Sequence, residues 1–113
     1  MNHFTGGRVK IANDILIKIT REAALEVNGV HEVVNGQDFV SYDKFATSDT
    51  SKGVKIGSKD GQLRIDVRVV AETSHDLAAL GEKIQQNIVD KMQVITGLTV
   101  VEVNVYIESV AKE

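Results

Sequence analysis

The chain has 113 residues, of which 42% are hydrophobic and 26% are charged, and its formal net charge is −3. These proportions are typical of a soluble globular protein, and the length predicts a single domain over 1–113. Cysteine is absent, which excludes disulfides, thiolate metal sites and a cysteine nucleophile and fits a reducing cytosol. The mildly acidic balance disfavours a dedicated nucleic-acid binder.

Nothing in the sequence is long and apolar enough to cross a bilayer. The longest run without Asp, Glu, Lys or Arg covers the ten residues 92–101, about half of the 20 that a spanning helix needs. The first residues also lack the basic and apolar regions of a signal peptide. We therefore expect a cytoplasmic protein that reaches a membrane only through a partner.

The first part of the chain predicts a strand, a helix and a second strand. Residues 7–12 alternate polar and apolar side chains, which is typical of a half-buried strand. Apolar residues then recur every three or four positions after Asn13, whose side chain is suited to cap a helix N-terminus. Gly29 is suited to end that helix, and residues 30–34 predict a short strand.

A long segment without periodicity follows. Residues 35–52 are rich in Asn, Asp, Gly, Ser and Thr, which indicates a loop. The predicted domain therefore has a core over 7–110 and a flexible loop over 36–52. Three of the five aromatic residues lie in this loop: Phe39, Tyr42 and Phe45. These side chains either pin the loop to the core or form a partner-binding surface.

The middle of the chain predicts a β-hairpin. Residues 53–56 begin one strand, Asp60-Gly61 is a strong turn signal, and residues 62–72 alternate again. On this second strand the apolar side chains share one face, and three charged side chains share the other: Arg64, Asp66 and Arg68.

A long helix and a last strand complete the chain. Thr73 and Asp76 have the spacing of a capping box, and Gly97 is suited to end the helix. The apolar stripe of this helix contains Leu77, Leu80, Ile84, Ile88, Met92 and Ile95. Residues 98–110 predict the strand. Its side chains expected to point towards the helices are Val101, Val103, Val105 and Ile107.

These elements predict an α+β fold in the order β-α-β-β-β-α-β. Because each helix has one apolar stripe and most strands have one apolar face, we expect two layers, with both helices packed on one face of a mixed β-sheet. The other face, called the open face below, is left to solvent or to a partner.

The open face is the candidate docking surface. Tyr106 should be its one large anchor, since a tyrosine ring buries area at an interface while its hydroxyl finds a partner. The alternative is a solvated tyrosine that packs on the stems of Arg64 or Arg68. The candidate partner-binding residues are Arg64, Arg68, Glu102 and Tyr106.

The residues offer no catalytic or metal site. Glycine spacing excludes dinucleotide-binding and P-loop motifs, and the three histidines, at 3, 31 and 75, form no i,i+4 pair for a metal. Ser74, His75 and Asp76 have the residue types of a hydrolytic triad, but they lie at a helix start, where Ser and Asp cap. No G-x-S-x-G motif is present. We expect no enzyme activity and no cofactor.

Short motifs are spaced along nearly the whole chain: GRVKIA (7–12), AALEVNGV (23–30), GVKI (53–56), DG (60–61), IQQNI (84–88) and TGLTVVEVNV (96–105). Their order and spacing resemble the alkaline-shock-protein family of Gram-positive bacteria, over residues 7–110. The chain departs from the family where Ser109 precedes the last valine of the final strand, since members often have glycine there. It also has no proline at the start of the long helix.

The resemblance implies a non-enzymatic protein of the general or envelope stress response that acts as a scaffold through protein–protein contacts. It implies self-association, a membrane-anchoring protein partner and no cofactor. Other members are linked to control of fatty-acid synthesis, which leaves such a regulator as an alternative. An RNA-binding regulator is a further alternative, disfavoured because Tyr106 is the only ring expected on the open face.

Overall fold

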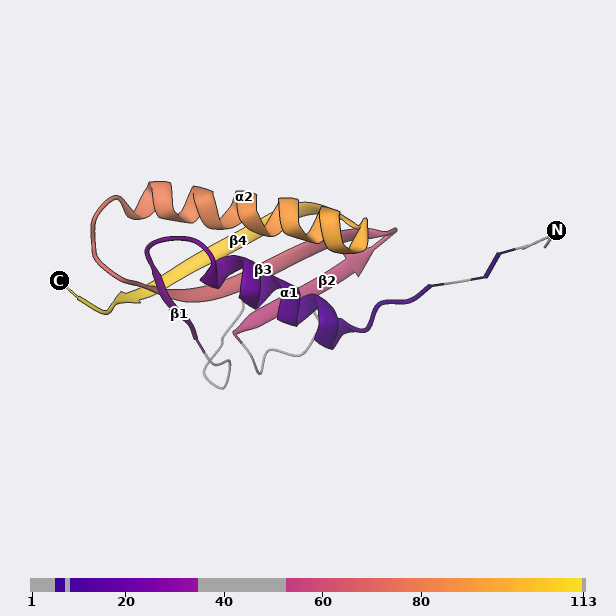
Figure 1. Cartoon of the computed structure of the whole chain (residues 1–113), viewed down its shortest axis with the longest axis horizontal. Helices are drawn as coiled ribbons and strands as arrows, with labels where there is room; N and C mark the ends of the chain where they lie inside the picture. The colour runs from indigo at the N-terminus through magenta and orange to yellow at the C-terminus, as the bar shows by residue number, and fades with distance from the viewer. Residues whose placement is uncertain (1–5, 8, 35–52, 113) are drawn as a thin grey trace.

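The computed structural model describes residues 6–7, 9–34 and 53–112. Their elements are α1 (Asn13–Leu25), β1 (Val30–Val33), β2 (Val54–Lys59), β3 (Gln62–Ala71), α2 (Leu77–Thr96) and β4 (Thr99–Val110). Both helices lie on the same side of one four-stranded sheet, as Figure 1 shows. The predicted two-layer α+β fold is therefore confirmed, and the loop predicted over 36–52 lies outside the described residues.

β3 is the central strand of the sheet. β1 and β2 pair antiparallel with its two halves, through Val33 opposite Val69 and Val54 opposite Val67. β4 pairs with β3 in parallel along the whole length of β3. β1 and β2 therefore both lie along the opposite edge of β3, one after the other. The sheet is mixed, as the sequence predicts. Since β3 and β4 are parallel, α2 makes the crossover between them.

The hairpin between β2 and β3 turns at Asp60 and Gly61, as predicted. Their φ angles are 53° and 77°, both in the left-handed region. Two consecutive left-handed residues form the type I′ turn, whose twist matches that of the flanking strands. This turn fixes the register in which Lys59 lies opposite Gln62.

The strand predicted over 7–12 is wrong. Within the described part of the chain these residues pair with no strand, and Val9 is 92% exposed. Alternation describes the local pattern, but a strand also needs an edge with which to pair. Ala12 rather than Asn13 occupies the N-cap position of α1, and its carbonyl accepts the first helical hydrogen bonds without a side-chain cap.

α2 begins and ends at residues suited to those positions. Asp76 is the N-cap, with φ of 49°, and its carboxylate accepts a hydrogen bond from the Ala79 N–H at 3.2 Å. The capping box starting at Thr73 is therefore not formed, because the cap lies three residues later. Gly97 ends the helix in the left-handed conformation, as predicted, and its N–H donates to the Gln93 carbonyl.

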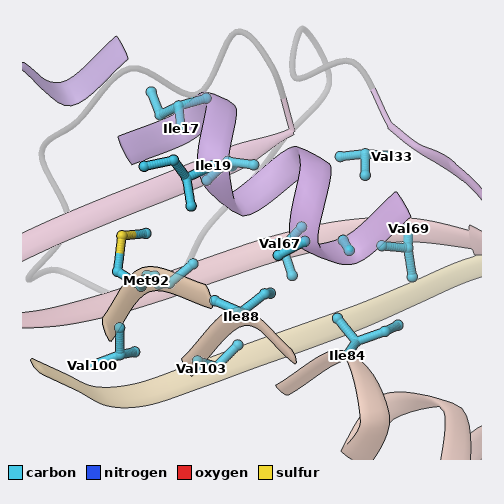
Figure 2. Packing of buried hydrophobic residues seen from close by; sticks show 14 of the residues in the cluster. Ile17, Ile19, Val33, Val67, Val69, Ile84, Ile88, Met92, Val100 and Val103 are labelled. Atoms are coloured by element: carbon cyan, nitrogen blue, oxygen red, sulfur yellow. The ribbon is translucent and has the colours of Figure 1, made fainter. Parts of the chain in front are cut away.

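The core lies between the helices and the sheet, where aliphatic side chains from both layers interdigitate (Figure 2). Ile84, Ile88 and Met92 from the predicted stripe of α2 are fully buried, as is Ile17 of α1. Thr20 is also buried, and its hydroxyl donates to the Leu16 carbonyl at 2.9 Å. This hydrogen bond avoids the free-energy cost of a buried hydroxyl without a partner.

The two helices are tied together by a polar contact. The Asn87 side-chain amide donates to the Ala23 carbonyl at 2.6 Å and to the Glu26 carboxylate at 3.2 Å. Glu26 also forms an ion pair with Lys91. The hydrogen bond from Lys91, followed by that from Asn87, holds the pKa of Glu26 below its ordinary value. The contact fixes the end of α1 against the middle of α2.

The start of β4 differs from the prediction. Val100 is buried, whereas Val101, expected to point inward, is 48% exposed. The β3–β4 register shifts here, since Leu63 lies opposite Val100 but Arg64 lies opposite Glu102. A bulge adds one extra residue to one strand, so the side chains before the bulge alternate in the opposite phase to those after it. From Val103 onward, the predicted inward positions hold.

Candidate functional site

The open face consists of the side chains that alternate with the buried ones on three adjacent strands. These residues are Lys55, Gly57 and Lys59 on β2, Gln62, Arg64, Asp66 and Arg68 on β3, and Glu102, Asn104, Tyr106 and Glu108 on β4. Most of them are polar or charged, in contrast to the aliphatic face below the helices. The four candidate residues predicted from the sequence all lie on this face.

The parallel register of β3 and β4 brings these candidates together in pairs. Arg64 lies opposite Glu102, and Arg68 lies opposite Tyr106. The Arg68 guanidinium also forms an ion pair with the Glu108 carboxylate, and the exposed fraction of the Arg68 side chain is only 14%. The Arg68 side chain is thus largely covered by its neighbours, and it offers little exposed surface for a partner to contact.

A second pairing was not found from the sequence. Asp66 is fully buried, and its carboxylate accepts a hydrogen bond from the Asn104 amide at 2.8 Å. The same amide nitrogen donates to the Glu102 carboxylate at 2.8 Å. One amide therefore holds two carboxylates that would otherwise repel each other. Alternation places Asp66 on this face, but only the register of β4 puts Asn104 opposite it.

Tyr106 is the exposed aromatic residue of the described part of the open face. It is 46% exposed, while the charged groups around it are engaged with one another. A half-exposed tyrosine presents both an apolar ring and a hydroxyl group at the surface. The register of the two strands places Tyr106 opposite Arg68.

A hollow lies at the end of the open face next to the β2–β3 turn. Its volume is about 590 Å³. It is lined by Gly57, Ser58, Lys59, Asp60, Gln62, Arg64 and Val101. Arg64 is the one sequence-predicted candidate that reaches it. The sequence signal for the hollow is a glycine inside a strand, between two lysines at i−2 and i+2.

The histidines and the triad-like residues are placed elsewhere. Asp76 caps α2 with its carboxylate, and the His75 N–H bonds to the Thr73 hydroxyl. His31 lies 3.4 Å from the Glu72 carboxylate, and His3 is outside the described residues. Among residues 6–7, 9–34 and 53–112, no cluster of His, Asp or Glu has the arrangement of a metal site. None of the helices there could span a membrane.

Comparison with known proteins identifies the family. A profile of the alkaline shock protein 23 family, described as having a cell envelope-related function, matches residues 2–112. The chain belongs to this family. YqhY of Bacillus subtilis, which is named as uncharacterized, is 30% identical over 101 residues, which are 89% of this chain and 75% of that protein.

Solved structures share the fold of this family member. A MamM CTD superposes with a TM-score of 0.61 at 14% sequence identity, over 86% of this chain and 96% of that one. A nickel form of a MamM CTD variant gives a TM-score of 0.60 at 13% identity, over 85% and 96% of the two chains. At this level of identity the likeness shows the fold alone.

Proposed function

We propose that this family member is a non-enzymatic scaffold of the cell envelope or general stress response. It acts in the cytoplasm through protein–protein contacts, by self-association and by binding a membrane-anchoring protein. The contact surface is the open face, with Tyr106 as its anchor. The observation that supports this most strongly is a half-exposed tyrosine on a sheet face where one ion pair and one bridging amide already hold four charged side chains: Arg68, Glu108, Asp66 and Glu102.

The physical argument concerns the cost of binding. Association loses free energy when flexible side chains are ordered and when polar groups lose water without finding partners. On the open face, Arg68 is paired with Glu108, and Asn104 is bonded to Asp66 and Glu102. A partner can therefore cover this face without ordering those groups again, and the apolar area of the Tyr106 ring supplies the gain.

The test is Tyr106→Glu, with Tyr106→Phe as the matched control. Glutamate puts a charge where a partner should bury a ring, whereas phenylalanine keeps the ring. The apparent mass by light scattering and the distribution between membrane and soluble cell fractions are measured. We expect Tyr106→Glu to shift towards monomer or to leave the membrane fraction, with an unchanged circular dichroism spectrum. If it behaves as the wild type in both measurements, the open face is not the functional surface.

Arg68 is unsuitable for this test. An Arg68→Glu change removes a largely buried ion pair and places a new carboxylate beside Glu108 and Asp66. Uncompensated buried charge destabilises the fold, so loss of binding would be uninterpretable. Arg64 is exposed and is the better position for a charge reversal on this face.

A further inference from the structure

Residues 7–12, called the arm below, alternate as a strand does but pair with no strand in the described part of the chain. Val9 is 92% exposed, and Figure 1 shows the segment before α1 running away from both layers. Val9 therefore buries almost no apolar area in the single chain. In a sheet, Val9 and the half-buried Ile11 would lie on the same face. The arm has the pattern of an added strand and lacks an edge with which to pair.

The outer edge of β4 has no neighbouring strand among the described residues, where β4 pairs with β3 alone. The 12 residues of β4 include no lysine, arginine or proline, which commonly protect an edge from further pairing. The two bulges, at Val101 and Glu108, lie towards its ends, so the stretch from Glu102 to Ile107 is regular. Such an edge accepts an extended segment through main-chain hydrogen bonds.

The apolar layer under α2 is incomplete at this edge. Val67 and Val69 of β3 are fully buried, whereas their register partners on β4, Val105 and Ile107, are only half-buried. A further strand with apolar side chains on the same face would cover these two residues. The alternate apolar positions of the arm supply such side chains.

The backbone groups on the outer edge alternate along β4. The Gln85 amide of α2 donates to the Val103 carbonyl at 3.0 Å, so this carbonyl is one that the ladder with β3 leaves available. Because alternate residues direct their backbone groups to the same edge, Val105 and Ile107 present theirs on the outer edge as well. The backbone of Tyr106, between them, faces β3. A strand centred on Val105 and Ile107 therefore leaves the contacts of Gln85 and Tyr106 in place.

Charge favours the arm as the occupant of this edge. Residues 1–13 contain Arg8 and Lys10 and no acidic residue, whereas β4 contains Glu102 and Glu108 and no basic residue. When Val9 lies on the helix side of the sheet, alternation puts Lys10 on the open-face side, where both glutamates lie. Each glutamate has a partner within the chain, so a cation from the arm adds to those contacts.

The length of the arm favours the edge of another copy over its own. α1 packs on β1 and β2, on one side of β3, whereas β4 lies on the other side. Neighbouring strands lie about 4.8 Å apart, so a strand outside β4 would be roughly 14 Å from β2. Six extended residues span about 20 Å. Crossing to its own β4 edge would use most of the arm and leave too little to pair.

We propose that the arm of one copy adds as a strand to the outer edge of β4 in a second copy. Its apolar side chains, Val9 and Ile11, cover Val105 and Ile107, and its basic side chains lie on the side of the glutamates. This inference rests on the self-association in the proposed function, and it states which segments of the two copies meet.

The first test is Val9→Glu, with Val94→Glu on α2 as the matched control. Both variants replace a highly exposed valine and change the net charge by the same amount. The dissociation constant of self-association is measured by analytical ultracentrifugation of the full chain. We expect Val9→Glu to weaken association at least tenfold and Val94→Glu to change it less than threefold, both with the wild-type circular dichroism spectrum. The proposal is overturned if Val9→Glu associates as tightly as the wild type, if both variants lose the same affinity, or if the wild type stays monomeric.

A disulfide trap tests the pairing itself, because the chain has no cysteine of its own. Val9→Cys is mixed under mild oxidation with a second chain that carries either Val105→Cys or Ile107→Cys, so a mixed disulfide must join two copies. With the better of the two positions, we expect at least tenfold more mixed dimer, identified by mass, than with Val94→Cys. A yield no higher than this control at both positions overturns the proposal. So does a disulfide that forms within one dilute, monomeric chain carrying both cysteines, because the arm then reaches its own edge.

The two proposals can fail separately. If Tyr106→Glu behaves as the wild type while Val9→Glu becomes monomeric and the mixed disulfide forms, the arm pairs with β4 and the open face is not the functional surface. If Tyr106→Glu shifts towards monomer or leaves the membrane fraction while Val9→Glu associates as the wild type, only the arm proposal is wrong.

Discussion

The two faces of β3 differ in what holds them together. On the inner face, Leu63, Ile65 and Val67 are buried against the helices and depend only on the exclusion of water. On the open face, Arg68 and Asp66 depend on particular partners across the strand, Glu108 and Asn104. A slip of one residue would turn the buried side chains of a strand outward, so the inner face requires the correct phase of alternation, and the open face requires in addition these particular partners on β3 and β4.

The largest effect should come from the inner face. Ile88→Ala removes a fully buried side chain from the α2 stripe, and we expect a loss of about 2–5 kcal/mol in the free energy of unfolding. The measurement is denaturant unfolding followed by circular dichroism. Val101→Ala is the control, because Val101 is half-exposed, and it should change stability by about 0.5 kcal/mol or less. Similar costs for the two variants would mean that the core is misplaced.

Substitutions on the open face should lower the free energy of unfolding less than Ile88→Ala does, and mainly where they break hydrogen bonds between side chains. Asn104→Ala removes the amide that donates to both Asp66 and Glu102. Leaving buried acceptors with fewer donors costs about 1–3 kcal/mol. Arg64→Ala, on the same face but exposed, should cost about 0.5 kcal/mol or less in the same unfolding assay. Equal costs would show that the open face is an ordinary solvated surface.

The smallest effect should come from the contact between the helices. The pKa of Glu26 is lowered in the folded protein, so its contact with Lys91 stabilises the fold at pH values above 4.5, the ordinary pKa of glutamate. That stabilisation is lost as the pH falls below this value and the carboxylate is protonated. The melting temperatures of the wild type and Glu26→Gln should differ slightly at neutral pH and converge in acid. A difference that grows in acid would contradict this.

Much of the inner face was predictable because burial follows simple periods. The α2 stripe from Leu80 to Met92, the hairpin at Asp60 and Gly61 and the end of α2 at Gly97 all follow from local sequence. Ile95, which was predicted to continue the stripe, is 52% exposed because the last turn of α2 extends past the core. The strand over 7–12 did not form among the described residues because pairing is not a local property. Val101 was misassigned since a bulge depends on how two strands align and not on either strand alone.

The candidate site was predictable only in part, for the same reason. Arg64, Arg68, Glu102 and Tyr106 were placed on the open face by alternation, and the structure confirms that placement. Whether they bind a partner remains a proposal. The burial of Asp66 and the support that Arg68 receives from Glu108 depend on cross-strand register, which no single segment contains. The hollow was missed because its main feature is an absent side chain.

Thiol labelling of single cysteines compares the two surfaces directly, because the chain has no cysteine of its own. Gln62→Cys reports on the open face, and Val94→Cys reports on the helix layer, where Val94 is 84% exposed. Labelling rates are compared between the purified, dilute protein and intact cells. We predict that Gln62→Cys is labelled several-fold more slowly in cells while Val94→Cys is unchanged. Protection of Val94→Cys with no protection of Gln62→Cys would contradict a docking role for the open face.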